Sequence, residues 1–406
     1  MFLVIDGLVF DSIDFTFRKV LVHPIIRMSF KFPLSFPVFE GNEKKYSNKA
    51  IEAGHLATYG EFIPKFERKL AREMHSHQAV ALNSGTSALH LAMVLLGIGP
   101  GDEVICQSFT FCASANPIVY LGAKPIFIDS EKDTWNMSPE LLEDAILSRI
   151  NEGKKPKAIV TVHLFGMPAK MNEILEIAGK YQIPVLEDAA EAVGSKYFGK
   201  FCGAIGKIGV YSFNGNKIIT TGGGGALISD DVFLIEKAKY LSTQAREDLP
   251  YYHHLEIGFN YKMNNLAAAI GLAQLEQLNA WVKKRRLINQ RYRELLDGFP
   301  GITFQEEQEG SYSNYWLSTI LIDPVTTGMN NDKLRVIFLK NDIETRFLWK
   351  PLHLQPVFQD MPYYGGNVSE NLFKTGLCLP SSVTLTLDDQ KLVVSHIEKE
   401  LIKTFG

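Results

Sequence analysis

The sequence predicts an α/β protein with a mostly parallel sheet, helices on both of its faces, and a smaller α+β unit after it. From about residue 80 to residue 230, short apolar segments alternate with stretches of helical periodicity, the pattern of parallel strands joined by helices. A long helical segment over residues 265–296 marks the passage to the C-terminal unit. At 406 residues the chain can hold one large and one small domain.

The larger unit is predicted to alternate helices with strands. A helix is predicted over 61–74, because Phe62, Phe66, Leu70 and Met74 are spaced four apart and share one face. Strands are predicted at 103–107, 125–129, 158–164, 184–187, 208–213 and 226–228. Helices are predicted over 139–150, where Ser138 is a suitable N-cap, and over 171–181.

The C-terminal unit is predicted to combine three strands with two helices. The strands are expected at 302–305, 316–322 and 345–349, and a helix is expected at 333–340. The final helix is expected to begin near Thr386, with Asp389 three residues later in the capping-box position.

Composition and charge indicate an ordinary globular protein that handles small molecules. The net charge is -3, so there is no electrostatic reason to expect nucleic acid or a membrane as partner. The four cysteines are scattered singly, which predicts reduced thiols in a cytoplasmic protein and no metal or redox pair. Partners are expected to be small molecules or a second copy of the chain.

The first 27 residues fit poorly with the rest of the chain. Residues 1–17 are apolar, but Asp6, Asp11 and Asp14 interrupt them, and the features of a signal peptide are missing. We predict that the native chain starts at Met28 and that residues 1–27 are an extension that is disordered or only loosely packed.

The most informative segment, residues 210–228, places Lys217 in a turn between two apolar strands. An amine held in this way loses its proton more readily than one in water, because burial disfavours the ammonium form, and it can then form a Schiff base. The alternative is an ordinary loop lysine beside a flexible glycine turn, 222–225. Because that glycine run leads into a strand, neither a Walker phosphate loop nor a dinucleotide fingerprint fits.

Other candidate residues lie where the predicted strands end, the usual place for ligands in such sheets. Residues 84–86 open an apolar helix, whose free N–H groups and hydroxyls make an anion site. Asp188 ends a strand and, taken alone, is more commonly a helix N-cap. Pyridoxal phosphate needs an anion site, a stacking surface, a carboxylate for its ring nitrogen and a lysine that forms a Schiff base. Residues 84–86 with Ser212, then Phe111, Asp188 and Lys217, supply these four groups in turn.

With these motifs the sequence resembles the DegT family of nucleotide-sugar aminotransferases, and within it the 4-amino-sugar enzymes such as UDP-N-acetylbacillosamine transaminases. The resemblance runs from about Phe32 to the C-terminus. The matching motifs are 82–86, 108–111, 187–191, 211–217, 242–247, 258–263 and 344–350 with His353. It implies the aspartate aminotransferase fold, which is pyridoxal phosphate fold type I, with a large cofactor-binding domain over 28–280 and a small domain over 281–406.

The resemblance also implies a role for each matching residue. Lys217 would bind pyridoxal phosphate as a Schiff base and move the proton, and Asp188 would pair with the pyridine nitrogen. Phe111 would stack on the ring, and Glu191 would lie near the ring hydroxyl. The residues implied at the phosphate are Ser84, Gly85, Thr86 and Ser212, with Lys262 reaching the phosphate of the neighbouring protomer in a homodimer with shared sites.

The nucleotide sugar is implied to lie against a further set of residues. They are Leu56, Ala57, Thr58, Tyr59, Asn260, Arg346, Trp349 and His353. For Arg346 two interpretations stay open, pairing with a diphosphate or an ordinary surface ion pair.

The implied reaction passes the amino group of L-glutamate, through pyridoxamine phosphate, to the C4 ketone of a UDP-linked 2-acetamido-4-keto-2,6-dideoxyhexose. The product is a 4-amino sugar for surface glycan biosynthesis. One alternative is another nucleotide-linked keto sugar, such as GDP-4-keto-6-deoxymannose. A dehydratase of the same family is disfavoured, since those relatives carry histidine in place of Lys217. A non-catalytic binding protein of the same fold is the remaining alternative.

Overall fold

The main sheet has eight strands in the order β1-β9-β8-β5-β4-β2-β3-β14 in a computed structural model that describes residues 30–405. The strands are β1 (Gln78–Leu82), β2 (Glu103–Gln107), β3 (Lys124–Ile128), β4 (Ala158–Val162), β5 (Val185–Asp188), β8 (Ile208–Ser212), β9 (Gly225–Ser229) and β14 (Tyr363–Tyr364). Strand β9 runs antiparallel to both of its neighbours, and the other pairs are parallel. The predicted extension over residues 1–27 lies outside the described residues.

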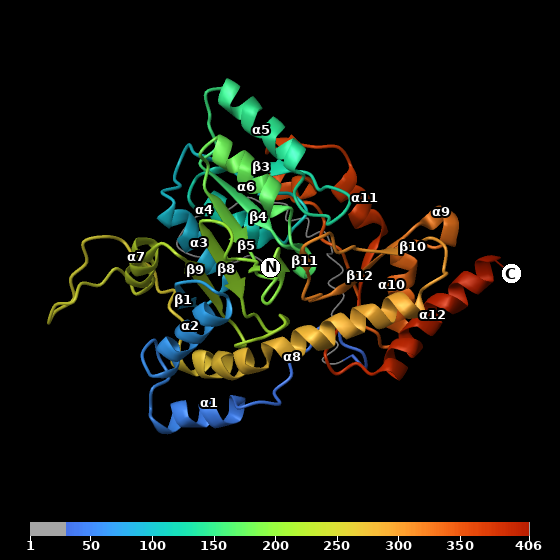
Figure 1. Ribbon diagram of the computed structural model, residues 1–406, viewed down its shortest axis with the longest axis horizontal. Coiled ribbons are helices and arrows are strands. Elements are labelled where there is room, and N and C mark those ends of the chain that lie inside the picture. The colour runs from blue at the N-terminus through green and yellow to red at the C-terminus, as the bar shows by residue number, and fades with distance from the viewer. Residues whose placement is uncertain (1–29, 406) are drawn as a thin grey trace, which may run out of the picture.

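Helices cover both faces of this sheet because its strands bury alternate side chains on opposite sides. In β1, Val80 and Leu82 face a core with α3 (Gly85–Leu95), α4 (Asn116–Tyr120) and α7 (Val232–Ser242). Ala79 and Ala81 face the opposite core, with α2 (Phe62–Glu73) and the first half of α8 (Asn265–Leu295). On that same side, α5 (Pro139–Asn151) and α6 (Met171–Lys180) cover the middle strands (Figure 1).

The C-terminal part is a separate layer joined to the sheet by α8, which runs under both in Figure 1. Its antiparallel sheet has the order β10-β12-β15-β13. These strands are β10 (Ile302–Phe304), β12 (Ser318–Ile322), β13 (Arg346–Phe347) and β15 (Gly376–Leu379), and the helices are α9 (Pro324–Thr327), α10 (Asn331–Lys340), α11 (Val368–Thr375) and α12 (Leu387–Phe405). Ile288 and Tyr292 of α8 belong to its core, so the predicted boundary at residue 280 falls within one continuous helix.

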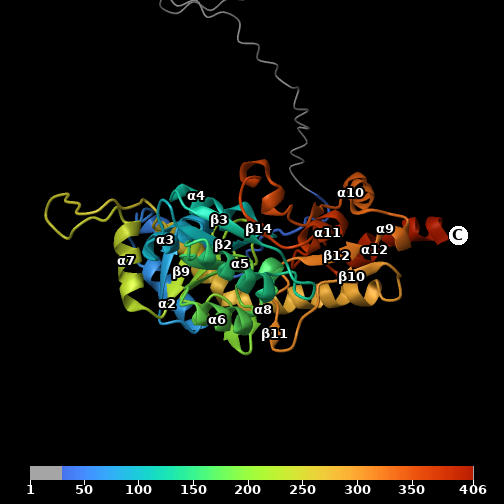
Figure 2. The ribbon, with the colours of Figure 1, turned by 90° about the horizontal axis from the view of Figure 1, so that it is seen from above.

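Two small pieces complete the described chain. Helix α1 (Glu43–Glu52) packs along α8, and β6 (Lys196–Tyr197), β7 (Lys200–Phe201) and β11 (Ser311–Tyr312) form a three-stranded sheet. The segment between α7 and α8 projects from the body of the molecule (Figure 1, Figure 2). Within residues 30–405, no helix is both long and apolar enough to cross a membrane.

The predicted fold class is confirmed, and most predicted elements agree with the structure to within two residues. The capping box is confirmed as well: the Thr386 N–H donates to Asp389 Oδ2 at 2.9 Å, and the Asp389 N–H donates to Thr386 Oγ1 at 3.2 Å. The predicted strand 158–164 stops at Val162, because Phe165 adopts a left-handed φ of 55°. The predicted strand 316–322 begins only at Ser318, because the chain turns at Tyr315, where φ is 45°.

Candidate active site

A cavity of about 410 Å³ opens where β4, β5 and β8 end, beside the start of α3. Ten residues predicted from the sequence line it: Ser84, Gly85, Thr86, Phe111, Asp188, Glu191, Ser212, Lys217, Arg346 and Trp349. The carboxyl ends of parallel strands meet at one edge of a sheet, which is why residues so far apart in the sequence converge here.

Lys217 lines this cavity beside a carboxylate and an aromatic ring. Its Nζ is 3.7 Å from Glu191 Oε1 and 3.9 Å from the centroid of the Trp316 ring. Burial lowers the pKa of Lys217, while the charges of Glu191 and Asp188 act in the opposite direction. A larger fraction of the amine is therefore neutral at ordinary pH than for a surface lysine, as a nucleophilic amine requires.

The turn that carries Lys217 is fixed at both ends. The Lys217 N–H donates to the Asn214 carbonyl at 3.0 Å, and the Phe213 N–H donates to the Gly224 carbonyl at 2.8 Å. Gly222 has a φ of 83°, a conformation that side chains disfavour. At Gly225, an added Cβ would lie 2.4 Å from the carbonyl carbon of Ser84, so the glycine run lets β9 approach the start of α3.

The start of α3 forms a cradle for an anion. The Ser84 hydroxyl caps the helix by accepting the Ser87 N–H at 3.0 Å, and the first N–H groups of a helix have no partner within it. A Cβ on Gly85 would lie only 3.0 Å from the Ser212 Cβ, so the missing side chain brings the Ser212 hydroxyl close to those N–H groups. Free N–H groups, a hydroxyl and the helix dipole together fit a phosphate.

Asp188 presents a buried carboxylate on the other side of the cavity. Its Oδ2 accepts the Ser114 hydroxyl at 2.7 Å, and its Oδ1 accepts the Ala190 N–H at 3.1 Å. Burial raises the pKa of Asp188, although these hydrogen bonds and the Lys217 charge oppose the shift. Such a carboxylate gains from a cationic partner, and a protonated ring nitrogen supplies one.

Glu191 is the second buried carboxylate near Lys217. Its Oε2 accepts the Phe165 N–H at 2.6 Å, which leaves Oε1 facing the lysine. Burial raises the pKa of Glu191 as well, and the Lys217 charge opposes that shift. The cavity thus holds one amine and two carboxyls, all three displaced toward their neutral forms.

Aromatic side chains form the mouth of the cavity. Phe111 is 50% exposed, unusual for a large apolar residue beside a core, and its ring lies 5.2 Å from that of Trp349. Within residues 30–405, the buried Nε1 of Trp349 has no hydrogen-bond partner. The exposed face of Phe111 suits a flat ring bound between Asp188 and the cradle.

The sequence did not identify Trp316, Asn214 and Asn216 as site residues, although all three line the cavity. Asn214 and Asn216 both lie within the three residues before Lys217 and could have been named from that alone. Trp316 carries no local signal, because only the folded chain brings it, about a hundred residues later, onto the lysine.

Seven predicted residues do not line this cavity in the single chain. They are Leu56, Ala57, Thr58, Tyr59, Asn260, Lys262 and His353. Lys262 bridges to Leu82 through its backbone, and the Asn260 carbonyl accepts the Asn83 amide at 3.1 Å. His353 instead stacks on Tyr363, with Nδ1 2.7 Å from the Ser108 hydroxyl.

Arg346 lines the cavity and also pairs with Glu344 at 3.3 Å. Its side chain is 58% exposed, so this pair is weak and leaves the guanidinium accessible to a second anion. The surface ion pair is therefore present in the structure, and pairing with a diphosphate stays a prediction for Arg346.

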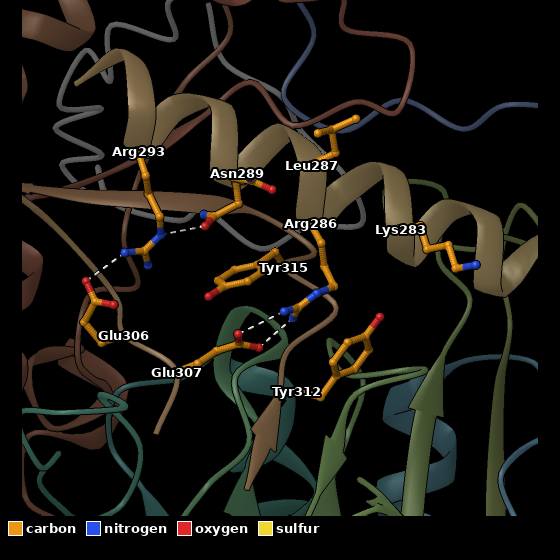
Figure 3. Close-up of a pocket in the computed structure, with 10 residues that line it drawn as sticks. Lys283, Arg286, Leu287, Asn289, Arg293, Glu306, Glu307, Tyr312 and Tyr315 are labelled. Atoms are coloured by element: carbon orange, nitrogen blue, oxygen red, sulfur yellow. Dashed lines mark hydrogen bonds and ion pairs between the residues drawn. The ribbon is translucent and has the colours of Figure 1, made fainter. Parts of the chain in front are cut away.

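A second cavity of about 490 Å³ lies between α8 and the chain from Glu306 to Tyr315, which includes β11 (Figure 3). Arg286 forms two hydrogen bonds to the Glu307 carboxylate, at 2.6 and 3.0 Å, and stacks over Tyr312 at 4.0 Å. Arg293 pairs with Glu306 at 2.7 Å. Each of these charges is already matched by a protein group.

Comparison with known proteins gives a consistent result. Residues 38–398 match the DegT/DnrJ/EryC1/StrS aminotransferase family. The chain is 46% identical to EpsN of Bacillus subtilis (strain 168), which its name gives as an inferred pyridoxal phosphate-dependent aminotransferase, over 90% of this chain and 94% of that one. It is 38% identical to the GDP-perosamine synthase of Escherichia coli O157:H7, over 87% and 94%. Among solved structures, a DegT DnrJ EryC1 StrS aminotransferase from Brucella abortus has a TM-score of 0.83 at 31% identity, over 88% and 95%.

Proposed function

Because the chain belongs to the DegT/DnrJ/EryC1/StrS aminotransferase family and is a pyridoxal phosphate-dependent enzyme, we propose that it aminates a nucleotide-linked 4-keto sugar. The acceptor is the C4 ketone of a UDP-linked 2-acetamido-4-keto-2,6-dideoxyhexose, and the donor is L-glutamate. The observation that carries this proposal is the buried amine of Lys217, held between Glu191, Asp188 and the anion cradle.

The residues of the cavity fit pyridoxal phosphate group by group. The N–H groups of Gly85 and Thr86 and the Ser212 hydroxyl would bind the phosphate, and Phe111 would cover one face of the ring. The Asp188 carboxylate would keep the ring nitrogen protonated. When bound, the cofactor supplies an electron sink for the bond that breaks at the α-carbon of the amino donor.

Lys217 has two tasks at different stages. Its neutral amine, favoured because burial lowers its pKa, would hold the cofactor. With the amino donor bound, the same Nζ would take the proton from the donor's α-carbon. With the keto sugar bound, it would move a proton in the reverse direction. Glu191 and Trp316 limit where the amine can lie during both steps.

A second candidate acceptor is a GDP-linked 4-keto-6-deoxymannose. It is favoured by the relatives that are named GDP-perosamine synthase. Arg346 and Trp349 lie at the mouth of the cavity, where a diphosphate of either nucleotide sugar meets a guanidinium. A guanidinium that pairs with a diphosphate does not distinguish UDP from GDP.

The proposal includes a cytoplasmic homodimer in which a second copy completes each site. The projecting segment between α7 and α8 carries exposed apolar side chains, among them Tyr252 at 80% and Ile257 at 90%. Large exposed apolar groups on one segment are typical of interfaces. Sedimentation of the purified protein tests this part: a monomer at micromolar concentration would refute it.

The test of the reaction uses purified, cofactor-loaded protein with L-glutamate and one keto sugar at a time. Mass spectrometry then identifies the aminated product. Amination of the UDP-linked sugar supports the first candidate, and amination of only the GDP-linked sugar replaces it with the second. If neither sugar is aminated while glutamate still converts the cofactor, the acceptor class is wrong.

A further inference from the structure

Arg285 of α8 is a buried cation without an acidic partner. It is 2% exposed, and within residues 30–405 no carboxylate pairs with it and its Nε has no hydrogen-bond partner. Burial lowers its pKa to about 9, which still leaves the guanidinium charged at neutral pH. A buried charge of this kind is costly unless other groups compensate for it.

The compensation comes from three neutral oxygens on distant segments. Nη1 donates to the Trp316 carbonyl at 3.0 Å and also to the Ser381 carbonyl, and Nη2 donates to the Ser35 hydroxyl at 2.8 Å. The planar fork of an arginine can hold several acceptors at once in fixed directions, which a lysine ammonium does not do.

Two of these partners converge on the residue before Lys217. The Ser35 hydroxyl donates to the Asn216 carbonyl at 2.6 Å, and the indole Nε1 of Trp316 donates to the same carbonyl at 2.7 Å. The ring of Trp316 in turn lies 3.9 Å from the Lys217 Nζ. Two routes of hydrogen bonds therefore connect Arg285 to the Asn216 carbonyl. One passes through the Ser35 hydroxyl, and the other passes through the backbone and indole of Trp316.

We propose that Arg285 is a positioning residue for Lys217. It fixes the Trp316 carbonyl and the Ser35 hydroxyl, which together hold the Asn216 carbonyl, so the lysine side chain leaves a rigid peptide and enters the buried space beneath the Trp316 ring. This inference deepens the proposed function and rests on Lys217 being the reactive amine. Arg285 itself does not line the cavity of the candidate active site.

The test compares Arg285→Met, Arg285→Lys and Ser35→Ala with the control Arg286→Met. Arg286 is the next residue of α8, but it faces the second cavity and pairs with Glu307 (Figure 3). Ser35→Ala keeps the guanidinium and the link through Trp316 and removes only the link through the Ser35 hydroxyl, so it tests the proposal even if an Arg285 variant does not fold. Near-ultraviolet circular dichroism establishes which variants are folded.

The first readout is the reactivity of Lys217 in cofactor-free protein. Each variant is treated with acetic anhydride over a range of pH, and peptide masses give the modified fraction of Lys217. Burial is the largest cause of the lowered pKa of Lys217, so release of the peptide should move the midpoint up by about one pH unit in Ser35→Ala and in the folded Arg285 variants. Arg286→Met should leave it unchanged.

The second readout is steady-state kinetics with the sugar that the enzyme accepts. Misplacement of the amine should lower kcat roughly 10- to 100-fold in the same variants and leave KM for the sugar unchanged. An unchanged Lys217 midpoint in folded Ser35→Ala and Arg285 variants overturns the proposal. If the midpoint shifts but the wild type aminates no sugar, the positioning role holds and the proposed function fails.

Discussion

Two of the cavities in the described part of the chain, the candidate active site and the second cavity along α8, have similar volumes of about 410 and 490 Å³ but differ in how their charged groups are paired. In the larger one, along α8, Arg286 and Arg293 each pair with a glutamate and donate their other hydrogen bonds to further protein oxygens (Figure 3). In the smaller one, an amine and two carboxyls are buried together, and each has its pKa displaced toward the neutral form. The volume of a cavity therefore does not identify the active site. Buried ionisable groups whose pKa values are displaced toward the neutral form do identify it.

The comparison also explains what each region contributes. The Arg286–Glu307 pair is about a quarter exposed, so it fixes the loop before β12 at a modest gain in stability. Burial raises the pKa of Tyr315 to about 12, so its hydroxyl does not titrate near neutral pH. Lys217, Asp188 and Glu191 are costly to bury, and the cost is consistent with groups retained for chemistry.

The largest expected effect is the loss of activity when Lys217 is removed from the candidate active site. Lys217→Ala should lower the rate of the glutamate half-reaction by roughly 10⁴-fold or more, because both the covalent anchor and the proton carrier are lost. The matched control is Lys283→Ala, since Lys283 lines the second cavity. Stopped-flow absorbance of the bound cofactor measures both. Equal losses in the two variants would remove the distinction between the cavities.

A carboxylate in each cavity gives the next comparison. Asp188→Asn keeps the shape and most hydrogen bonds but loses the charge that keeps the ring nitrogen protonated, so kcat should fall roughly 10²- to 10³-fold. Glu306→Gln, which affects only the exposed pair with Arg293, should leave kcat within experimental error. A fully active, cofactor-saturated Asp188→Asn enzyme would show that this carboxylate does not act on the ring.

Glu191→Gln should shift the pH dependence without abolishing the reaction. The Glu191 charge raises the pKa of Lys217 against the lowering by burial, so its removal should lower that pKa further. The neutral amine then persists to lower pH, and the acidic limb of the single-turnover rate profile should move down by about one pH unit. An unchanged acidic limb would mean that the carboxyl of Glu191 is already neutral in the active enzyme, and an upward shift would contradict this account of the lysine's pKa.

The smallest effect is expected for Glu307→Gln in the second cavity. The loss of a partly exposed ion pair should reduce the free energy of unfolding by about 1 kcal/mol, with kcat unchanged. Urea unfolding measured beside the activity assay tests this. A large loss of activity in a stable protein would point to a functional role for the second cavity.

Much of the fold and part of the candidate site could be predicted from local sequence. Residues 84–86 and 211–217 each combine a strand end, a turn and a chemical group within a few positions, so their neighbourhood is visible in the chain itself. Strand β14 has only two residues and joins the main sheet from more than two hundred positions away, which no periodicity reveals.

Residues whose role depends on distant contacts were not accessible in that way. Trp316 and Arg285 reach the Lys217 peptide only because α8 and the turn before β12 pack against it. In the sequence, Arg285 is one cation in a basic helical stretch, indistinguishable from Arg286. The resemblance implies that Lys262 contacts the cofactor phosphate and that residues 56–59 contact the nucleotide sugar. In the single chain these residues do not line the cavity, so their roles stay predictions.

The most direct test of the central claim is to locate the lysine that carries the cofactor. Borohydride reduction of the holoenzyme fixes the cofactor covalently, and peptide mass spectrometry identifies its site. We predict the added mass on the peptide that contains Lys217, with no addition in Lys217→Ala and an unchanged result in Lys283→Ala. Cofactor fixed on any other lysine, or none fixed while cofactor is bound, would contradict the account.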